Sequence, residues 1–302
     1  MSNLFQRAFK DERRTKALIG LSSKEFYDLA KPFEENLEKS RNSPKNTRKR
    51  APGGGKKHTL SLLEEKLFFI LYYFKTYPTF DVLAADFNVD RGTACRWVQA
   101  FLPVLEQTLE QEGVLPKRET GTVEEFIENF PEVDELYIDG TERPTQRPSD
   151  YALQKEFFSG KKKDHTNKNL VLSNACREIL VLSKTKPGRN HDYALFKELN
   201  PQIPSYVVNW VDLGFQGIEK DFPSLEVIIP NKKPRGGELT ADQKADNTMV
   251  ARMRIVSEHA IGGIKRLKVV TDVFRNRKKN FADLFMLLAC GLWNFHLTNS
   301  FW

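Results

Sequence analysis

The spacing of apolar residues changes once along this 302-residue chain, near Gly113, and this change constrains the fold more than any other feature. Before Gly113 apolar residues recur at helical spacing, whereas after it they gather in short runs bounded by turn residues, as in strands. We expect strands over residues 133–139, 170–173, 179–183, 206–212 and 227–230. Helices are expected over residues 191–199, 240–268 and 281–297. Strands that first cluster and then alternate with helices predict an α/β fold, in which helices flank a mixed sheet.

The part before Gly113 is predicted to be all-α, and two longer helices come first. A sequence like a capping box at Ser22–Glu25 begins a helix that ends near Ser40. A second helix runs from Thr59 to about Tyr77, because the proline that follows ends it.

Two short helices joined by a tight turn are expected next, with Thr79 and Asp90 as their N-caps. A longer helix followed by such a pair is the layout of a helix-turn-helix unit, whose second helix enters the major groove of DNA. The residues that would reach the DNA are Arg91, Thr93 and Arg96. Those expected to lock the pair together are Val82, Leu83, Phe87, Ala94, Trp97 and Val98. An ordinary helical bundle is the alternative, and the neighbouring basic segment favours DNA binding.

That basic segment runs from Arg41 to Lys57 and contains no acidic residue. Its seven Lys and Arg residues equal the net charge of the whole chain, +7. Because the segment also contains prolines and three consecutive glycines, we expect a flexible cationic linker that binds a phosphate backbone, with Arg48, Lys49 and Arg50 at its centre. A solvated or nuclear-targeting linker is the alternative.

The remaining composition argues for a cytoplasmic protein that binds no membrane, and the expected DNA binding would make it nucleoid-associated. The first residues alternate charges with isolated apolar residues and therefore do not form a secretory signal. The three cysteines lie far apart in no paired spacing, which fits a reducing compartment. The longest apolar run, residues 284–293, is about half of the ~20 residues that a membrane span needs, so we expect a buried helix there.

Three acidic residues are candidates for chemistry. Asp139 and Asp212 are expected to close the first and fourth strands, and Glu258 lies within the long helix. Carboxylates at such positions are costly to bury unless they are paired or bind a metal. Three hard carboxylates without a Cys or His cluster suit Mg²⁺ or Mn²⁺. Alternatives remain for each residue, because both aspartates could belong to turns and Glu258 to a solvated helix face.

Two cationic residues on the same face of the expected helix favour Glu258 as a metal ligand. Arg254, Glu258 and Lys265 are spaced i, i+4 and i+11 along the expected helix, so they form one stripe. Such a stripe can hold a metal ligand between two cations that bind phosphate.

Five motifs, in order, resemble the DDE transposases of bacterial insertion sequences, in particular those whose nuclease domain is also similar to the eukaryotic Harbinger type. The motifs are Asp139–Pro148, Phe157–Lys163, Lys186–Asp192, Asp212–Gly217 and Ser257–Arg266. The chain departs from the family pattern twice: Phe158 stands where the family often has Tyr before Ser-Gly-Lys, and Ala251 stands at a position that is Tyr in related enzymes.

The resemblance implies an RNase H-like catalytic domain over residues 114–302, after an N-terminal helix and basic linker (1–57) and a helix-turn-helix region (58–113). It implies that Asp139, Asp212 and Glu258 form a catalytic triad that binds two Mg²⁺ or Mn²⁺ ions. The cations expected to hold DNA near this triad are Lys161, Lys162, Lys163, Arg254, Lys265 and Arg266. A solvated lysine turn is the alternative for the first three.

The activity implied is that of a DNA transposase. Such an enzyme binds the terminal inverted repeats of double-stranded DNA, hydrolyses a phosphodiester at the element's end and joins the new 3′-hydroxyl to target DNA. Because both ends must be cut together, a homodimer or higher oligomer is expected. Two alternatives stay open: a catalytically silent DNA-binding protein derived from a transposase, and a metal-dependent nuclease that cuts without joining.

Overall fold

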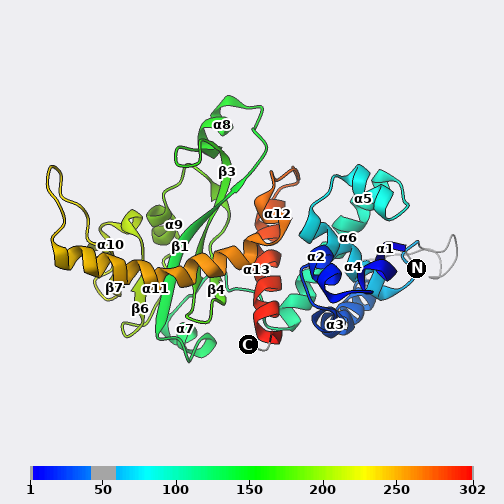
Figure 1. Cartoon of the computed structure of the whole chain (residues 1–302), viewed down its shortest axis with the longest axis horizontal. Helices are drawn as coiled ribbons and strands as arrows, with labels where there is room; N and C mark the ends of the chain where they lie inside the picture. The colour runs from blue at the N-terminus through cyan, green and yellow to red at the C-terminus, as the bar shows by residue number, and fades with distance from the viewer. Residues whose placement is uncertain (1–2, 42–58, 301–302) are drawn as a thin grey trace. The chain divides into compact units, whose positions relative to one another are not determined.

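The computed structural model describes residues 3–41 and 59–300 (Figure 1). They cluster into two compact units, which we describe one at a time. Unit 1 contains the described residues up to Val114, the segment Arg266–Val270 and the residues from Phe295 onward, while unit 2 contains Leu115–Lys265 and Thr271–Asn294. The predicted DNA contacts Arg48, Lys49 and Arg50 lie outside the described residues.

Unit 1 is built mainly from helices with an aromatic core. Its helices are α1 (Asn3–Ala8), α2 (Glu12–Ile19), α3 (Ser23–Arg41), α4 (Leu63–Thr76), α5 (Phe80–Asp86) and α6 (Arg91–Gln111). The side chains of Phe26, Phe33, Phe68 and Phe87 are almost completely buried. The four helices predicted in this part are confirmed, whereas α1 and α2 have no clear apolar periodicity in the sequence.

The predicted capping box at the start of α3 is also confirmed. The backbone N–H of Glu25 donates to Ser22 Oγ over 3.1 Å, and the backbone N–H of Ser22 donates to Glu25 Oε2 over 2.5 Å. The same glutamate contacts His296 near the end of the chain, with 2.6 Å between Glu25 Oε1 and His296 Nδ1. Unit 1 therefore joins the beginning of α3 to a distant part of the sequence.

Unit 2 contains a seven-stranded mixed sheet. Its strands are β1 (Glu135–Pro144), β2 (Phe158–Ser159), β3 (Asp164–Ser173), β4 (Ile179–Leu182), β5 (Lys186–Pro187), β6 (Val208–Trp210) and β7 (Glu226–Ile228). The order is β2-β3-β1-β6-β7, with β4 and β5 paired to β3. Strand β1 is antiparallel to β3 and parallel to β6, which is in turn parallel to β7. This arrangement confirms the predicted RNase H-like α/β class.

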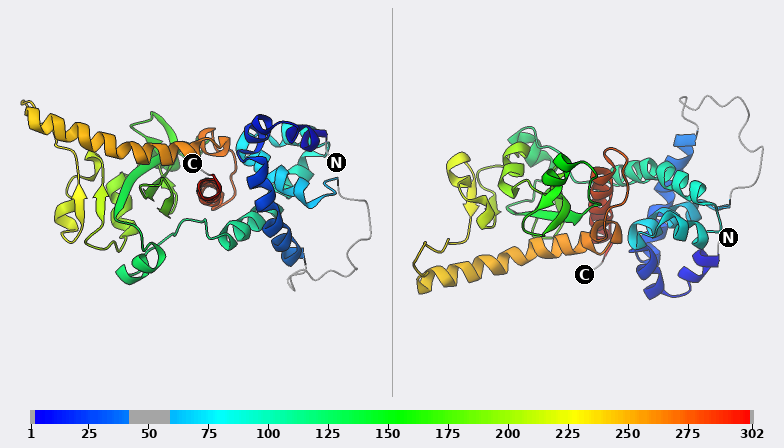
Figure 2. Two further views of the ribbon diagram at one scale, coloured as in Figure 1. Left: turned by 60° about the horizontal axis from the view of Figure 1, so that its bottom comes forward. Right: turned by 90° about the horizontal axis from the view of Figure 1, so that it is seen from above.

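Helices flank this sheet. They are α7 (Val123–Asn129), α8 (Tyr151–Phe157), α9 (Asp192–Leu199), the 3₁₀ turn η1 (Leu213–Phe215), α10 (Ile218–Asp221) and α11 (Ala241–Lys265), and the unit boundary falls within α12 (Lys268–Thr271) and α13 (Phe281–Asn299). The views of Figure 2 show the long helix α11 lying along one side of the sheet, in agreement with its contacts to β1, β3 and β6.

The two faces of the sheet have separate apolar clusters, as the alternation of side chains along a strand requires. Leu136 and Ile138 of β1 point into the larger cluster, which also contains Phe196 of α9. Tyr137, between them, points to the opposite face and packs with Trp210 of β6 and Val250 of α11. The face covered by α11 is therefore the face of Tyr137.

The predicted end of β1 is wrong, because Asp139 does not close the strand. The fourth predicted strand is shorter than expected, since β6 ends at Trp210 and Asp212 follows it. Strand β1 continues to Pro144, and β3 pairs with it over Tyr137–Pro144, so that Asp139 stands opposite Val171. A turn at Asp139–Gly140 is excluded by this ladder. Sequence pattern missed the extension because residues 139–144 are mostly polar, and the pairing with β3 satisfies their backbone groups instead.

Helix α13 contains the apolar run that was predicted to form a buried helix. In the part of the chain that the structure describes, it is the single helix long and apolar enough to span a membrane. Phe285, Met286 and Leu288 are fully buried within the protein. The structure therefore confirms a core helix.

Candidate functional site

Asp139 and Asp212 lie on the same side of the sheet because of strand register. Tyr137 and Trp210 are paired between β1 and β6, and their rings stack 6.2 Å apart on the face covered by α11. Each aspartate lies two residues beyond one of these aromatic residues. Val211, between Trp210 and Asp212, points into the opposite cluster, so the alternation continues to Asp212. Both carboxylates therefore belong to the face of α11.

Helix α11 brings an arginine to Asp139. Arg254 Nη2 lies 3.9 Å from Asp139 Oδ1, and the two side chains are 21% and 22% exposed. Burial raises the pKa of Asp139, Arg254 opposes this shift, and Asp212 and Asp192 add to it, so that the pKa reaches about 6. Asp139 and Asp212 are therefore close enough to repel each other.

The hydrogen bonds of the two aspartates leave one oxygen of each available to a ligand. Oδ1 of Asp139 accepts from the backbone N–H of Gly140 over 2.8 Å, and Oδ1 of Asp212 accepts from that of Gly214 over 2.8 Å. In the described residues, all hydrogen bonds to these two carboxylates go to Oδ1. The Oδ2 atoms can accept a cation or a water molecule.

Glu258 lies on α11 one turn after Arg254, and its side chain is exposed. Among residues 3–41 and 59–300, no three His, Cys, Asp or Glu side chains lie close enough together to hold a metal ion. The structure thus brings Asp139 and Asp212 together and leaves Glu258 on the facing helix, outside their immediate group.

A fourth acid, Asp192 at the start of α9, lies beside Asp139 and was missed as a site residue in the sequence. A Cβ atom added to Gly140 would lie 2.3 Å from Asp192 Oδ1, so the carboxylate fills the place of the missing side chain. Lys168 Nζ forms ion pairs with Asp192 Oδ1 (3.2 Å) and with Glu142 Oε1 (3.1 Å). The Asp192 Oδ1 atom is buried, with this ion pair but no hydrogen bond. An acidic residue in the first turn of a helix is common, so the sequence alone gives little sign of this role.

The chemistry of the paired aspartates Asp139 and Asp212 suits a divalent cation. Carboxylates are the ligands that Mg²⁺ and Mn²⁺ prefer, and Glu258 would have to join the two aspartates to complete a site of three acids. Repulsion from Asp212 and Asp192 contributes to the raised pKa of Asp139, and a bound cation relieves such repulsion.

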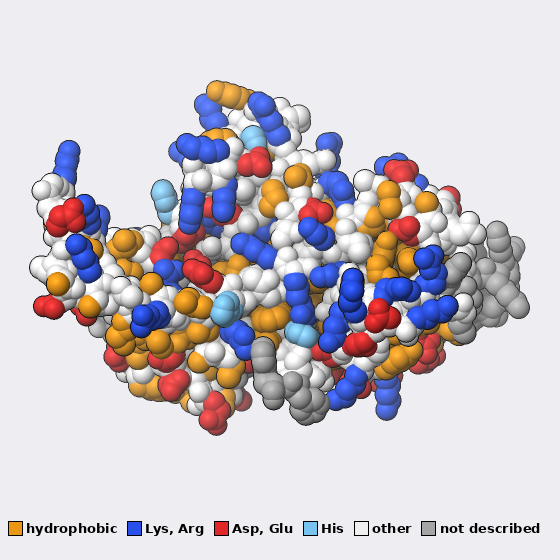
Figure 3. Space-filling view, viewed as in Figure 1, with side chains coloured by type: hydrophobic (Ala, Val, Ile, Leu, Met, Phe, Trp, Pro, Cys, Tyr) orange, Lys and Arg blue, Asp and Glu red, His pale blue; other side chains and the backbone are white. Residues whose placement is uncertain are grey.

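Basic side chains of unit 2 surround these acids. Lys161, Lys162 and Lys163 are exposed on the turn between β2 and β3. Burial lowers the pKa of Lys265 on α11, and the charges of Lys162 and Lys161 lower it further, while Asp139 and Glu142 act in the opposite direction. The lysine turn, Lys265 and the acids are therefore neighbours. Figure 3 shows Lys and Arg side chains on the tip formed by α8 and the β2–β3 turn, beside acidic side chains in the hollow next to α11.

Arg266, predicted to bind DNA with Lys265, clusters with unit 1 instead. Burial lowers its pKa, and the charge of Glu25 acts in the opposite direction. Arg266 therefore lies near Glu25, the glutamate of the capping box that begins α3.

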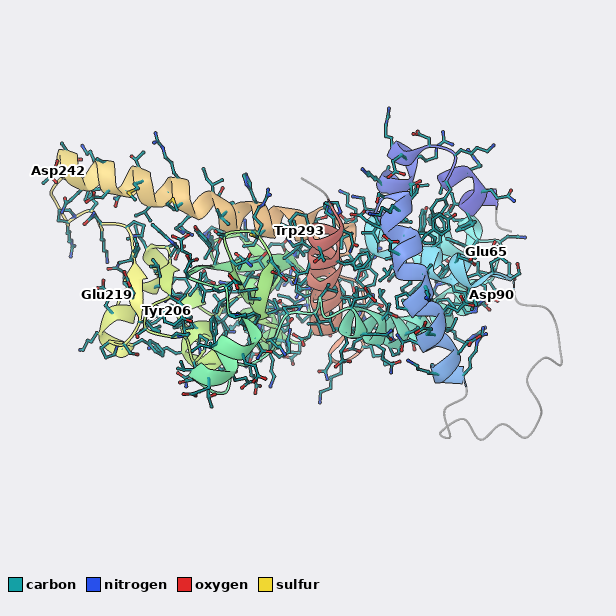
Figure 4. The ribbon with its side chains drawn as sticks, turned by 90° about the horizontal axis from the view of Figure 1, so that it is seen from below. Glu65, Asp90, Tyr206, Glu219, Asp242 and Trp293 are labelled. Carbon is teal, nitrogen blue, oxygen red and sulfur yellow. The ribbon has the colours of Figure 1, made fainter. Side chains whose placement is uncertain are left out.

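Helices α5 and α6 of unit 1 form the predicted pair joined by a turn. Thr79 Oγ1 accepts from the backbone N–H of Val82 over 3.3 Å, and Asp90 Oδ1 accepts from that of Thr93 over 2.8 Å, so both predicted N-caps are present. Asp90 is labelled in Figure 4. Arg91 and Arg96 are exposed, as a DNA-binding helix requires.

The packing of this pair differs from the prediction at one residue. Leu83, Phe87, Ala94 and Val98 are buried as expected. Trp97 is half-buried, with its ring 5.5 Å from that of Phe69. Val82 is 51% exposed, so the prediction for Val82 is wrong. A helix of seven residues has room for one buried stripe, and Leu83 and Ala84 occupy it.

Comparison with known proteins matches two parts of the chain to family models. Residues 138–294 match the family described as DDE superfamily endonuclease, and residues 58–111 match the helix-turn-helix of DDE superfamily endonuclease. The chain is 29% identical over 289 residues to the probable transposase for insertion sequence element IS702 of Microchaete diplosiphon, covering 94% of this chain and 95% of that protein. No solved structure matches the chain.

Proposed function

We propose, from the premise that this chain belongs to the DDE superfamily of endonucleases, that it is a transposase which cuts the DNA at the ends of an insertion sequence and joins them to a target. The observation that carries the proposal is the register of β1 and β6, which sets Asp139 and Asp212 side by side under α11. The neighbouring lysine turn supplies the positive charge that a DNA backbone requires.

In this proposal Asp139, Asp212 and Glu258 would hold two divalent cations, Mg²⁺ or Mn²⁺. Such ions, when bound, activate the attacking oxygen and stabilise the leaving oxygen of a phosphodiester. Glu258 is exposed on α11, one turn from Arg254, which contacts Asp139. A change of rotamer or a small movement of α11 when DNA binds would bring its carboxylate toward the aspartates.

The remaining residues of unit 2 hold the acids and the DNA in place. Arg254 restrains the Asp139 carboxylate, and Asp192 packs against the Gly140 backbone next to it. Lys161, Lys162 and Lys265 bind the phosphates on either side of the scissile bond, because Lys265 interacts with Asp139 and Glu142 and the other two lysines interact with Lys265. Lys163 extends this contact along the strand.

Unit 1 recognises the element ends in this proposal. Arg91, Thr93 and Arg96 read the terminal inverted repeat from the start of α6, and the basic segment around Arg48–Arg50 binds the adjacent backbone. A homodimer or larger assembly on DNA would bring two ends together, since each chain carries one site.

The test is nicking of a duplex that carries the inverted repeats flanking the gene, with the full chain and Mg²⁺ or Mn²⁺. We compare wild type with Asp139→Asn and Glu258→Gln, and with Asp242→Asn as a control at the far end of α11 (Figure 4). The proposal predicts metal-dependent nicking that falls at least about 1000-fold in the first two variants and is unchanged in the third. Equal nicking by all four proteins would disprove the assigned roles.

Two alternatives give different products in the same assay. A nuclease that only hydrolyses yields nicked DNA without strand-transfer products. A catalytically silent DNA-binding protein binds the inverted repeat but never nicks it with either metal, and the separation of Glu258 from the two aspartates makes this the alternative to test first.

A further inference from the structure

The β2–β3 hairpin of unit 2 presents two different faces. Ser159 and Asp164 are paired across it, as are Phe158 and His165. Along the same strand β3, Val171 is the partner of Asp139. Because side chains alternate along a strand and His165 is six residues from Val171, Phe158 and His165 belong to the face of Asp139, with their rings 5.7 Å apart. Ser159 and Asp164 belong to the opposite face, which is that of Glu142.

A cavity of about 580 Å³ lies beside Phe158 and His165. It is lined by Arg147, Tyr151, Lys155, Phe158, His165 and Arg189, together with Gln154. None of the described residues that line it is acidic. Its volume is in the range of pockets that bind small molecules.

The pocket combines cations with exposed aromatic rings. Tyr151 is 70% exposed and Phe158 is 42% exposed, whereas most aromatic side chains of the sheet are buried. Lys155 Nζ lies 4.5 Å from the centre of the Tyr151 ring, and Arg147 is held by Gln154 over 2.8 Å. Exposed rings among fixed cations suit a ligand that has both a flat apolar part and a negative charge.

A nucleotide has both a flat base and a negatively charged phosphate. Its base must be unpaired to stack on the rings of this pocket. Bases within a duplex are stacked on their neighbours and cannot place a face on Tyr151 or Phe158. An unpaired base can stack on an aromatic ring while arginine or lysine binds its phosphate. We propose that this pocket binds an unpaired nucleotide of the DNA next to the cleavage site.

The path to this pocket follows from the hairpin, and the inference rests on the proposed function. The turn with Lys161–Lys163 connects Ser159 to Asp164, and strand β3 leads from it to Val171, the partner of Asp139. His165 is six residues from Val171 on the same face, a distance of about 20 Å along the strand, so a DNA strand whose scissile phosphate lies at Asp139 would reach the pocket within a few nucleotides. Arg147 and Arg189 would bind its phosphates there, since both are exposed.

The experiment uses the full chain and a single-stranded oligothymidylate of ten nucleotides with one central 2-aminopurine. The fluorescence of 2-aminopurine is quenched when this base stacks on an aromatic ring. We titrate wild type, Phe158→Leu, Phe158→Tyr and Tyr151→Ala without metal, so that cutting does not contribute. Tyr206→Ala serves as the control, because Tyr206 is 52% exposed and lies outside the pocket (Figure 4). A duplex of the same length is titrated in parallel.

The proposal predicts that wild type quenches the fluorescence and that Phe158→Leu and Tyr151→Ala weaken binding of the oligothymidylate by about 5- to 100-fold. Phe158→Tyr, which keeps a ring, should retain quenching, and all variants should bind the duplex as wild type does. Quenching that is unchanged in Phe158→Leu and Tyr151→Ala would overturn the proposal. Equal losses for single strand and duplex would also overturn it, because they indicate backbone contacts alone.

This result is separable from that of the nicking assay. Loss of quenching in the pocket variants of a protein that never cuts DNA supports the pocket and contradicts the proposed catalytic function. Normal nicking together with no quenching by wild type or any variant supports the proposed catalytic function and disproves nucleotide binding in the pocket.

Discussion

At the scale of single residues, the site holds Asp139 where burial and repulsion by neighbouring carboxylates disfavour its ionised form. Asp139 lies near Asp212 and Asp192, and Arg254 offsets only part of this repulsion. The sequence predicted Asp139 and Asp212 because each follows an apolar run. It could not predict the place of Asp192, which depends on a contact with Gly140 between β1 and α9.

Replacing Asp139 with asparagine should stabilise the protein near neutral pH. The pKa of Asp139 in the folded state is raised from 3.8 to about 6, so the folded chain binds more protons than the unfolded chain between these values, and stability falls as the pH rises through them. In EDTA at pH 7, Asp139→Asn should raise the free energy of unfolding by up to about 3 kcal/mol, and this gain should shrink toward pH 4. Thermal melting at both pH values measures it, and a lower Tm for the variant at pH 7 contradicts this view of the site.

Gly140 is the second residue whose replacement is informative. A Cβ at this position would lie within 2.8 Å of three atoms of the Asp192 carboxyl group, so Gly140→Ala must displace that group. We expect slower nicking by at least about tenfold with unchanged binding of the inverted repeat, because unit 1 is not altered. Gly262→Ala on α11 is the control, since a Cβ there meets no atom within 4 Å. Full nicking by Gly140→Ala would show that Asp192 does not position Asp139.

At the scale of elements, most helices and strands could be predicted from apolar spacing, capping residues and Pro78. The elements that were missed are short or depend on tertiary contacts. Strands β2 and β5 have two residues each and exist because β3 pairs with them. Helix α6 runs past its predicted end near residue 102 because Val104, Leu105 and Leu109 are buried, which outweighs the cost of Pro103 within the helix.

The start of α3 should give unit 1 a dependence on acidic pH. Burial raises the pKa of Glu25, but hydrogen bonds from His296 and Ser22 outweigh it and lower the pKa to about 2. The stabilisation is therefore complete above pH 4.5 and is lost as the pH falls toward 2. Glu25→Gln should destabilise the protein by up to about 3 kcal/mol at pH 7, measured by urea unfolding.

Glu34→Gln is the matched control, because Glu34 is exposed on the same helix. An equal stability change in the two variants would show that the contact with His296 contributes nothing specific.

At the scale of the whole molecule, the described chain forms two compact units, and each is built from separate stretches of the sequence. The segments Arg266–Val270 and Phe295 onward cluster with the N-terminal helices, and a reading of the sequence from one end to the other cannot detect this. The buried Phe26 and Phe33 also make α3 part of the core of unit 1, so removing the N-terminal residues would disrupt the fold as well as the basic segment.

Charge neutralisation is the better test of the basic segment. Replacing Arg48, Lys49 and Arg50 with glutamine removes three cations without removing any described helix. If they bind phosphates, the slope of log K against log salt for the inverted repeat should become shallower by up to about 2.7. An unchanged slope from fluorescence anisotropy titrations would remove this segment from the DNA interface.

The central claim is that Asp139, Asp212 and Glu258 together bind divalent cations when DNA is present. Electron paramagnetic resonance of Mn²⁺ titrated into the complex of the full chain with its inverted-repeat DNA tests it directly, without relying on catalysis. We expect two bound ions per chain for wild type, and at most one for Glu258→Gln and for Asp139→Asn. Equal numbers of tightly bound ions in wild type and both variants would contradict it.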